Sequence, residues 1–433
     1  MAQACRLHGS RLPNSAPRAL PAMQRALLAA VLWAAGAATA WGIGHRLQTR
    51  SAFELQSSLL SAARGHNWTK LGRSIKIYVY DLPSNVSFHV GEADRNRNYY
   101  YEVAVPLLLR ASALHRTFRP EEADFFYVPA ELNSHWYLCK TKGCDSPPWD
   151  VDKKVVAFLR SVGPYWDTHQ DRHVVPSLAC PVLPGNAYAV RPSYTQLWEG
   201  RAVQLCLWAD RQTIDKRRSL HVGYYVPDMA ANEPLPPDAR DRDILAVYIG
   251  APINHCRSKV AAWMQRSCRD CRAFVVREHG NASTNLLHDY HATLRRARFA
   301  IEPPGDTMER MSRDASILAG AVPVVFDNPQ GMKLKRQYLP WQPALDWSNF
   351  SVNFALTELE VGDIVGSFVP RLEKLLRGMV QSGEADRLYQ GLVAAQSKLR
   401  WSEDGVVSTL AALLARKRYL ATLKRKPKTQ STK

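Results

Sequence analysis

The clearest hydrophobic pattern along the chain lies between residues 298 and 328, and it predicts a strand, a helix and a second strand. Residues 299–301 are apolar, and the Pro-Pro-Gly sequence at 303–305 ends this run. Residues 322–326 form a second apolar run, which is typical of a parallel strand covered on both sides. Between the runs, apolar residues recur at helical spacing, namely Met308, Met311, Ala315, Leu318 and Ala319. The pattern is therefore that of a βαβ unit with a glycine turn before its helix.

The start of this helix is a candidate anion site. Asp306 and Thr307 follow Gly305 and are favourable N-cap residues. Free backbone N–H groups and the helix dipole both favour negative charge at such a turn. Arg310 could neutralise a pyrophosphate, and Asp314, one turn further on, could accept ribose hydroxyls. The alternative is an ordinary α/β crossover that carries surface charges.

Further elements on both sides of this unit predict an α/β fold. A Pro-rich, charged stretch at 232–243 resembles a linker, so we predict one domain over 74–240 and another over 241–400. The alternation of strands and helices favours doubly wound parallel sheets. Strands are expected at 75–80, 125–128, 244–249 and 274–276, and helices at 99–114, 151–162, 258–265, 285–296 and within 361–399.

The amino-terminal part contains an uncharged run at 26–44, which is about one membrane width when helical. It predicts a signal anchor with a cytosolic basic tail at 1–25 and a polar stem at 45–73. A signal peptide cleaved near 38–40 and an Arg-rich transit peptide are the alternatives.

The positive charge is concentrated at the two ends of the chain. The net charge is +18, but residues 1–50 carry six Arg and residues 416–433 carry eight Lys or Arg, with no acidic residue in either segment. The remaining body has a net charge of only +4. A nucleic-acid groove on a folded domain is therefore not expected, and 401–433 is predicted to be a basic tail.

Seven of the eight cysteines follow the leader. Cys139 and Cys144 form one cluster, and Cys256, Cys268 and Cys271 form another, which suggests local disulfides in an oxidising compartment. Zinc binding by the second cluster and simple buried thiols are the alternatives. Asn-X-Ser/Thr sites that would suit a lumenal glycoprotein occur at Asn67, Asn85, Asn281 and Asn349.

Three stretches of sequence resemble the exostosin family of glycosyltransferases, in particular its plant and algal branch with xyloglucan galactosyltransferases. They are IYVYDLP at 77–83, the text from YEVAVPLLLRAS at 101–112 to the VP at 128–129, and PPGDT at 303–307 with the LAG and VPVVF that follow. The resemblance implies a GT-B-like fold, in which two Rossmann-like domains face each other across a cleft. It also implies a type II Golgi membrane enzyme with a lumenal catalytic domain, alone or in a complex of glycosyltransferases. Such an enzyme transfers a sugar, with inversion, from a nucleotide sugar to a polysaccharide or glycan.

The resemblance and the helix-start argument together give the predicted donor-binding residues. Arg257 stands where the family also has an Arg at a helix start, and it is expected to assist the phosphates. In gapless register, the acidic residue of the family falls on Ala315, and Asp314 stands one place earlier. The full predicted set is Arg257, Gly305, Asp306, Thr307, Arg310 and Asp314.

We predict no metal and no cofactor besides the donor substrate. The two Asp-X-Asp sequences, at 150–152 and 241–243, do not follow apolar strands, so chance is the better explanation for both. An inverting transfer needs a base on the acceptor side. His173 and Glu131 are the predicted catalytic residues, although each could instead be structural. A glycan-binding relative that has lost catalysis is the alternative function.

Overall fold

The computed structural model describes residues 68–87, 99–143, 148–180, 197, 200–209, 218–226, 235, 239–252, 254–276, 284–303, 310–327, 339–342, 344–357 and 368–425. The expected cytosolic tail, signal anchor and nearly all of the stem lie outside these residues. Among the helices that are described, none is both long enough and apolar enough to cross a membrane.

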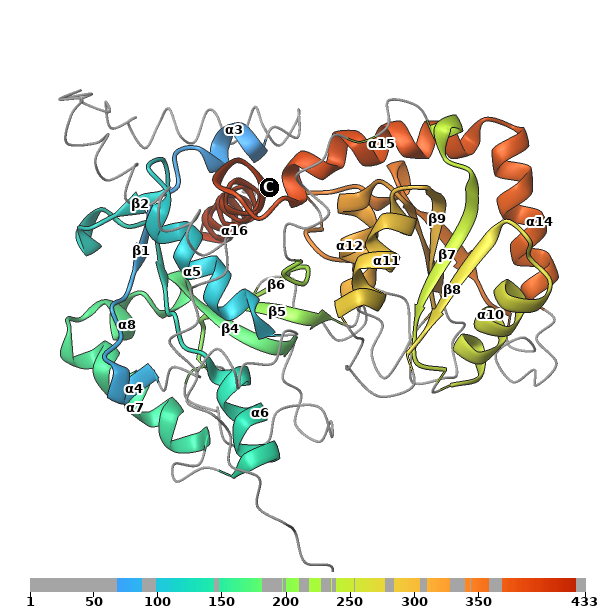
Figure 1. The fold of residues 1–433 in the computed structure, drawn as a ribbon. Coiled ribbons are helices and arrows are strands. Elements are labelled where there is room, and N and C mark those ends of the chain that lie inside the picture. The colour runs from blue at the N-terminus through green and yellow to red at the C-terminus, as the bar shows by residue number, and fades with distance from the viewer. Residues whose placement is uncertain are drawn as a thin grey trace, which may run out of the picture. The chain divides into compact units, whose positions relative to one another are not determined.

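The first half of the described chain forms a parallel sheet in the order β2-β1-β3-β4-β5-β6 (Figure 1). Its strands are β1 (Ile77–Val79), β2 (Arg116–Thr117), β3 (Phe125–Tyr127), β4 (His173–Cys180), β5 (Val203–Ala209) and β6 (Ser219–His221). The helices of this half are α3 (Trp68–Gly72), α4 (Ser84–Ser87), α5 (Tyr101–Ala111), α6 (Leu132–Lys142), α7 (Pro148–Ser161) and α8 (Tyr165–Thr168). Residues of β1, β3 and the first part of β4, residues 173–177, are almost all buried, as expected of a parallel sheet covered by helices.

The second half forms a separate parallel sheet in the order β11-β10-β9-β7-β8. Its strands are β7 (Ile244–Gly250), β8 (Cys271–Val275), β9 (Ala297–Glu302), β10 (Val322–Asp327) and β11 (Val352–Ala355). The helices are α10 (His255–Arg266), α11 (Thr284–Leu294), α12 (Met311–Ala319), α14 (Phe368–Gln381) and α15 (Glu384–Leu399). Two parallel sheets confirm the α/β class and agree with a GT-B-like fold.

The chain changes direction in the second sheet between β7 and β9. From β7 it moves outward to β8, and it then returns across β7 to β9 and continues to β10 and β11. Because such crossovers are right-handed, the reversal places α10 on one face and α11 and α12 on the other. Consistent with this, α11 packs against α12, whereas α10 packs against α14. The ribbon shows the same division (Figure 1).

The predicted tail at 401–433 needs a correction. Residues Ser408–Arg425 form helix α16, which follows a π-helical turn at Glu403–Val407 and packs against α3. Leu410, Leu413 and Leu414 are spaced three and four apart and are buried. The Lys and Arg residues between 416 and 425, which suggested a loose tail, therefore belong to the same helix as these buried leucines.

The cysteines follow the expected oxidising pattern in part. Cys268 and Cys271 form a disulfide, as the clustering predicted, and Cys139 and Cys206 each take part in a further disulfide. Cys256 has a free thiol, and burial raises its pKa to about 12, so it remains protonated at neutral pH. Because Cys268 and Cys271 are joined in a disulfide, their sulfur atoms are not thiolates that could bind the zinc ion considered for this cluster.

Candidate functional site

The reversal between β7 and β9 creates a topological switch point, the position at which open parallel sheets bind ligands. A ligand bound at this point would lie at the carboxyl ends of β7 and β9, which are Gly250 and Glu302. Gly250 allows another group to come close to the backbone, because a Cβ there would lie 2.8 Å from the Tyr248 hydroxyl and 3.0 Å from Arg310 Nη2.

Arg310 connects the two strand ends. Its Nη1 donates to the Pro303 carbonyl at 2.9 Å, and its Nη2 donates to the Ile249 carbonyl. Its Nε lies 2.8 Å from Glu302 Oε2, and the guanidinium carbon lies 5.6 Å from the centre of the Tyr248 ring. Only 8% of the Arg310 side chain is exposed. Arg310 thus holds the carboxyl ends of β7 and β9 together, and its predicted contact with a diphosphate stays a prediction.

Glu302 was missed by the sequence analysis, although it lies at the centre of this arrangement. It is 3% exposed, and Ser312 Oγ donates to its Oε2 at 2.6 Å. Burial raises the pKa of Glu302, and the positive charge of Arg310 acts in the opposite direction. The signal was present in the sequence: an acidic residue directly follows an apolar strand and precedes the Pro-Pro-Gly turn.

Arg257 lies near the same strand ends, and its predicted contact with the phosphates stays a prediction. It is in the first turn of α10, where its backbone N–H donates to Asn254 Oδ1 at 3.0 Å. Burial raises the pKa values of Tyr248 and Glu302, and the charges of Arg310 and Arg257 both oppose this rise. The structure thus brings two guanidinium groups, together with the N-terminus of a capped helix, to the carboxyl end of β7. This combination suits an anion.

Three predicted donor residues, Gly305, Asp306 and Thr307, lie outside the described residues. The helix that follows them begins later than expected. Its N-cap is Arg310, in an extended conformation and without a side-chain capping bond, so Asp306 and Thr307 are not the N-caps of α12. Helical spacing alone placed Met308 in this helix, whereas its first residue is Met311.

Asp314 points toward the segment after β6. Its Oδ2 accepts a hydrogen bond from the Tyr224 backbone N–H at 2.7 Å, and burial raises its pKa to about 6. A Cβ on Gly223 would lie 3.2 Å from this carboxylate. Trp341 and Trp401 also line the small space around it. This geometry connects α12 to residues 223–224, and the predicted contact with ribose stays a prediction.

The candidate bases on the first sheet have contrasting positions. Glu131 follows the carboxyl end of β3 and occupies the N-cap position of α6, with 5% of the residue exposed. His173 is at the amino end of β4 and is fully buried. Its Nε2 lies 2.9 Å from the Tyr80 hydroxyl, and its Nδ1 lies 3.0 Å from the His169 carbonyl oxygen. Burial lowers the pKa of His173 to about 4. A core histidine that is held at both nitrogens fits a structural role better.

The start of α6 is held by Glu102, a second residue that the sequence analysis missed. One oxygen of its carboxylate accepts from the backbone N–H and the side-chain amide of Asn133, at 3.0 and 2.6 Å. The other oxygen accepts from the backbone N–H and the hydroxyl of Ser134, at 3.0 and 2.9 Å. Glu102 comes from α5, so it fixes the turn that carries Glu131 and His135 from a different helix.

Comparison with known proteins identifies the family. The model of the exostosin GT47 domain matches residues 71–367, well over half of the chain. The chain belongs to the exostosin family. A "Probable glucuronosyltransferase" of rice (Oryza sativa subsp. japonica) is 23% identical over 322 residues, which is 70% of this chain and 73% of that protein. A "Probable beta-1,4-xylosyltransferase" of Arabidopsis thaliana is 23% identical, covering 64% of this chain and 67% of its own.

A shorter match extends the range of these relatives. A "Probable xyloglucan galactosyltransferase" of Arabidopsis thaliana is 31% identical over 123 residues, which is 28% of this chain and 24% of that protein. The family resemblance noted from the sequence is therefore confirmed, and the chain is a glycosyltransferase of the kind that acts on polysaccharide. Such an enzyme uses a nucleotide-sugar donor and a glycan acceptor.

Proposed function

We propose that this exostosin-family enzyme transfers a sugar residue from a nucleotide sugar to a polysaccharide or glycan with inversion and without a metal ion. We further propose that it does so in the Golgi lumen as a type II membrane protein. The observation that carries the proposal is the pair of arginines at the switch point, where Arg310 joins the ends of β7 and β9 and Arg257 stands at the start of α10. A departing diphosphate needs this kind of preorganised positive charge.

We expect Arg310 and Arg257 to have different roles, one in positioning the chain and the other in contacting the diphosphate. The guanidinium of Arg310 is largely engaged with Glu302 and the carbonyls of Pro303 and Ile249, so it fixes the point at which the chain leaves β9 toward Gly305, Asp306 and Thr307. Arg257 is half-buried at a helix N-terminus, and it is the stronger candidate for direct contact with the diphosphate. The same helix end contributes backbone N–H groups and the positive end of its dipole.

Glu131 is the residue that we propose as the base. In the inverting step, an acceptor hydroxyl oxygen attacks the anomeric carbon while the bond from that carbon to the diphosphate oxygen breaks. The electron pair leaves with the diphosphate, and the hydroxyl proton passes to the carboxylate. Glu131 follows a strand at its carboxyl end, where parallel sheets place functional groups, whereas His173 is enclosed among Tyr80, Phe126 and Trp166.

The test is a screen of nucleotide sugars with the full chain, in which hydrolysis and transfer are measured with and without a chelator. Transfer to a polysaccharide with inverted configuration and no loss in the chelator is the expected result. Arg257→Ala should lower kcat/KM by about 100-fold, in line with the removal of one preorganised donor. Glu131→Gln should lower kcat by about 100-fold or more, with KM little changed.

The exposed Arg371 on α14 supplies a control, and Arg371→Ala should leave these constants unchanged. Calorimetry with the same nucleotides separates the alternatives. If no nucleotide binds to the wild-type chain, the glycan-binding relative without catalysis becomes the better description. If binding occurs but activity needs a divalent metal, the metal-independent part of the proposal is wrong.

A further inference from the structure

The amino-terminal edge of the second sheet, opposite the switch point, carries a second group of arginines. A pocket of about 330 Å³ opens there, before the start of β7 and β8 and beside the end of α14. Asp243, Asp270 and Arg298 stand at or next to the first residues of three neighbouring parallel strands. Because β7 has seven residues, this edge lies about 20 Å from its carboxyl end. The residues that line the pocket are Arg240, Arg242, Asp243, Leu245, Asp270, Arg298, Arg377, Val380 and Gln381.

Two of these guanidinium groups are held by backbone carbonyls. Arg242 donates to the carbonyls of Leu294, Ala297 and Ala319, at 2.8–3.1 Å. Arg298 donates to the carbonyls of Arg242 and Arg240. In the part of the chain that the structure describes, neither forms an ion pair with a carboxylate. Arg242 is 1% exposed and lies over the Tyr389 ring, so it adds positive charge behind the pocket without contacting a ligand. Arg298 is half-buried, so its guanidinium is the group that would stabilise an external anion in the pocket.

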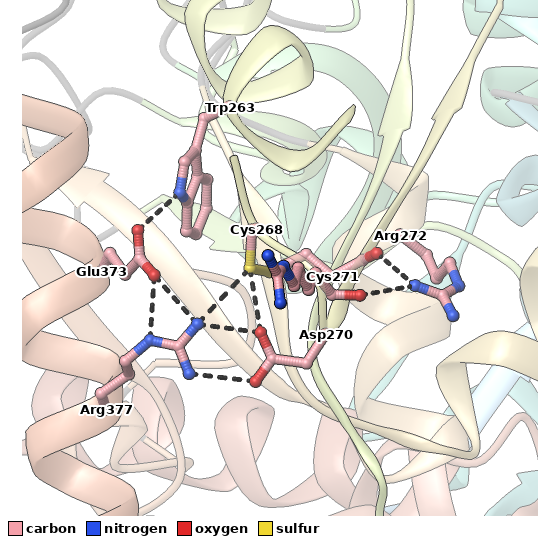
Figure 2. Close-up of polar contacts among 8 residues, drawn as sticks. Trp263, Cys268, Asp270, Cys271, Arg272, Glu373 and Arg377 are labelled. Carbon is pink, nitrogen blue, oxygen red and sulfur yellow. Dashed lines mark hydrogen bonds and ion pairs between the residues drawn. A yellow bond between two sulfur atoms is a disulfide. The ribbon is translucent and has the colours of Figure 1, made fainter. Parts of the chain in front are cut away.

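The two carboxylates at the rim make this site different from a phosphate site. Asp270 accepts from both terminal nitrogens of Arg377, at 2.9 and 3.0 Å, and Figure 2 shows this pair beside the Cys268–Cys271 disulfide. Asp243 pairs with Arg296 and remains 57% exposed. Rim carboxylates repel a compact polyanion, but they accept hydrogen bonds from hydroxyl groups. The carbonyls at the end of α14 have the same preference, because the C-terminus of a helix is its negative end.

We propose that this pocket binds an acidic saccharide, with a sugar carboxylate at Arg298 and the sugar hydroxyls at Asp243 and Asp270. The site lies on the sheet edge opposite the switch point, so it holds an acceptor polymer away from the reacting end. The choice of a saccharide rests on the proposed function, whereas the binding itself needs no sugar transfer. A variant that no longer binds the saccharide in this pocket should therefore still transfer sugar to short acceptors at the wild-type rate.

The experiment measures binding of trigalacturonate to the full chain by calorimetry, with no donor present. Arg298→Gln should weaken binding by about tenfold or more, because a charge-assisted hydrogen bond is lost. Arg298→Lys keeps the charge but loses the planar fork, so it should retain part of the affinity. Arg387→Gln is the matched control, since Arg387 is an exposed arginine on α15 that pairs with Glu384 outside the pocket.

Two other ligands test whether the pocket prefers an acidic sugar to a neutral sugar and to phosphate. Neutral xylotetraose should bind at least about tenfold more weakly than trigalacturonate, and inorganic phosphate should show no binding that depends on Arg298. Phosphate binding that Arg298→Gln removes would replace the saccharide by a phosphate ligand and overturn the proposal. It would also be overturned if trigalacturonate failed to bind, or if Arg387→Gln weakened binding as much as Arg298→Gln. The melting temperature of each variant confirms that it is folded.

Discussion

Glu102 in the first half and Glu302 in the second are both buried carboxylates, but their partners differ in kind. Glu302 is paired with a guanidinium at 2.8 Å, and Ser312 provides one hydroxyl donor. Glu102 has four neutral donors, all from the first turn of α6, and burial raises its pKa to about 7. Burial raises the pKa of both carboxylates, but the positive charge of Arg310 opposes the rise at Glu302, whereas neutral donors oppose it at Glu102. The two sites should therefore respond differently to mutation and to pH.

The largest effect is expected when the cation is removed from the second site. Arg310→Ala leaves Glu302 buried without its cation, so the free energy of unfolding should fall by about 3–5 kcal/mol. Denaturant titration of the wild type, Arg310→Ala, Glu302→Gln and the double variant gives the coupling energy between the two side chains. If the stability loss of the double variant equals the sum of the two single losses, Arg310 and Glu302 are not coupled. The proposed difference between Glu302 and Glu102 would then be wrong for Glu302.

A smaller loss is expected when the neutral cap is removed from the first site. Glu102→Ala leaves the backbone N–H groups of Asn133 and Ser134 without their acceptor, so the free energy of unfolding should fall by about 2–3 kcal/mol. Amide hydrogen exchange should then show faster opening at the start of α6. Glu121→Ala serves as the control, because Glu121 is exposed and pairs with Arg119 at the surface. A loss in the control equal to that in Glu102→Ala would contradict the capping role.

The pH dependence sharpens the same comparison. The pKa of Glu102 is about 7 in the folded chain and about 4.5 when unfolded, so between these values the folded state binds more protons. Its contribution to stability therefore declines as pH rises through this window, by about 1.4 kcal/mol for each pH unit. The difference in unfolding free energy between the wild type and Glu102→Gln should follow this slope from pH 5.5 to 6.5. A difference that stays constant would show that four donors are enough to keep the carboxylate charged.

The sequence could predict the parts of these sites that depend on local pattern. Arg310 was chosen because a helix start beside a parallel strand is recognisable from spacing, and Arg257 because the exostosin family has an Arg at the same helix start. Glu102 could not be found in this way. In the sequence it is an acidic residue in the first turn of α5, where it favours the dipole of its own helix. Its role in capping α6, 31 positions further on, arises only when the two helices are packed together.

The same distinction explains the other differences between sequence and structure. The helical run expected over 361–399 is two helices, because Gly383 adopts a positive φ of 78° between α14 and α15. The short edge strand β2 has only two residues, Arg116 and Thr117, and its hydrogen bonds to β1 depend on tertiary contact. Asp314 has a local pattern that suited a ligand, but its nearest donor is a backbone N–H 90 residues earlier in the chain.

The smallest expected effect concerns His173, which distinguishes a core residue from a base. His173→Phe removes the hydrogen bonds to the Tyr80 hydroxyl and the His169 carbonyl but keeps a ring among Phe126 and Trp166. The free energy of unfolding should fall by about 1–2 kcal/mol, because the Tyr80 hydroxyl loses its partner. A structural residue should leave kcat within about threefold of the wild type at a temperature where the variant is folded. A loss of about 100-fold in kcat, matching the loss expected for Glu131→Gln, would instead make His173 the base.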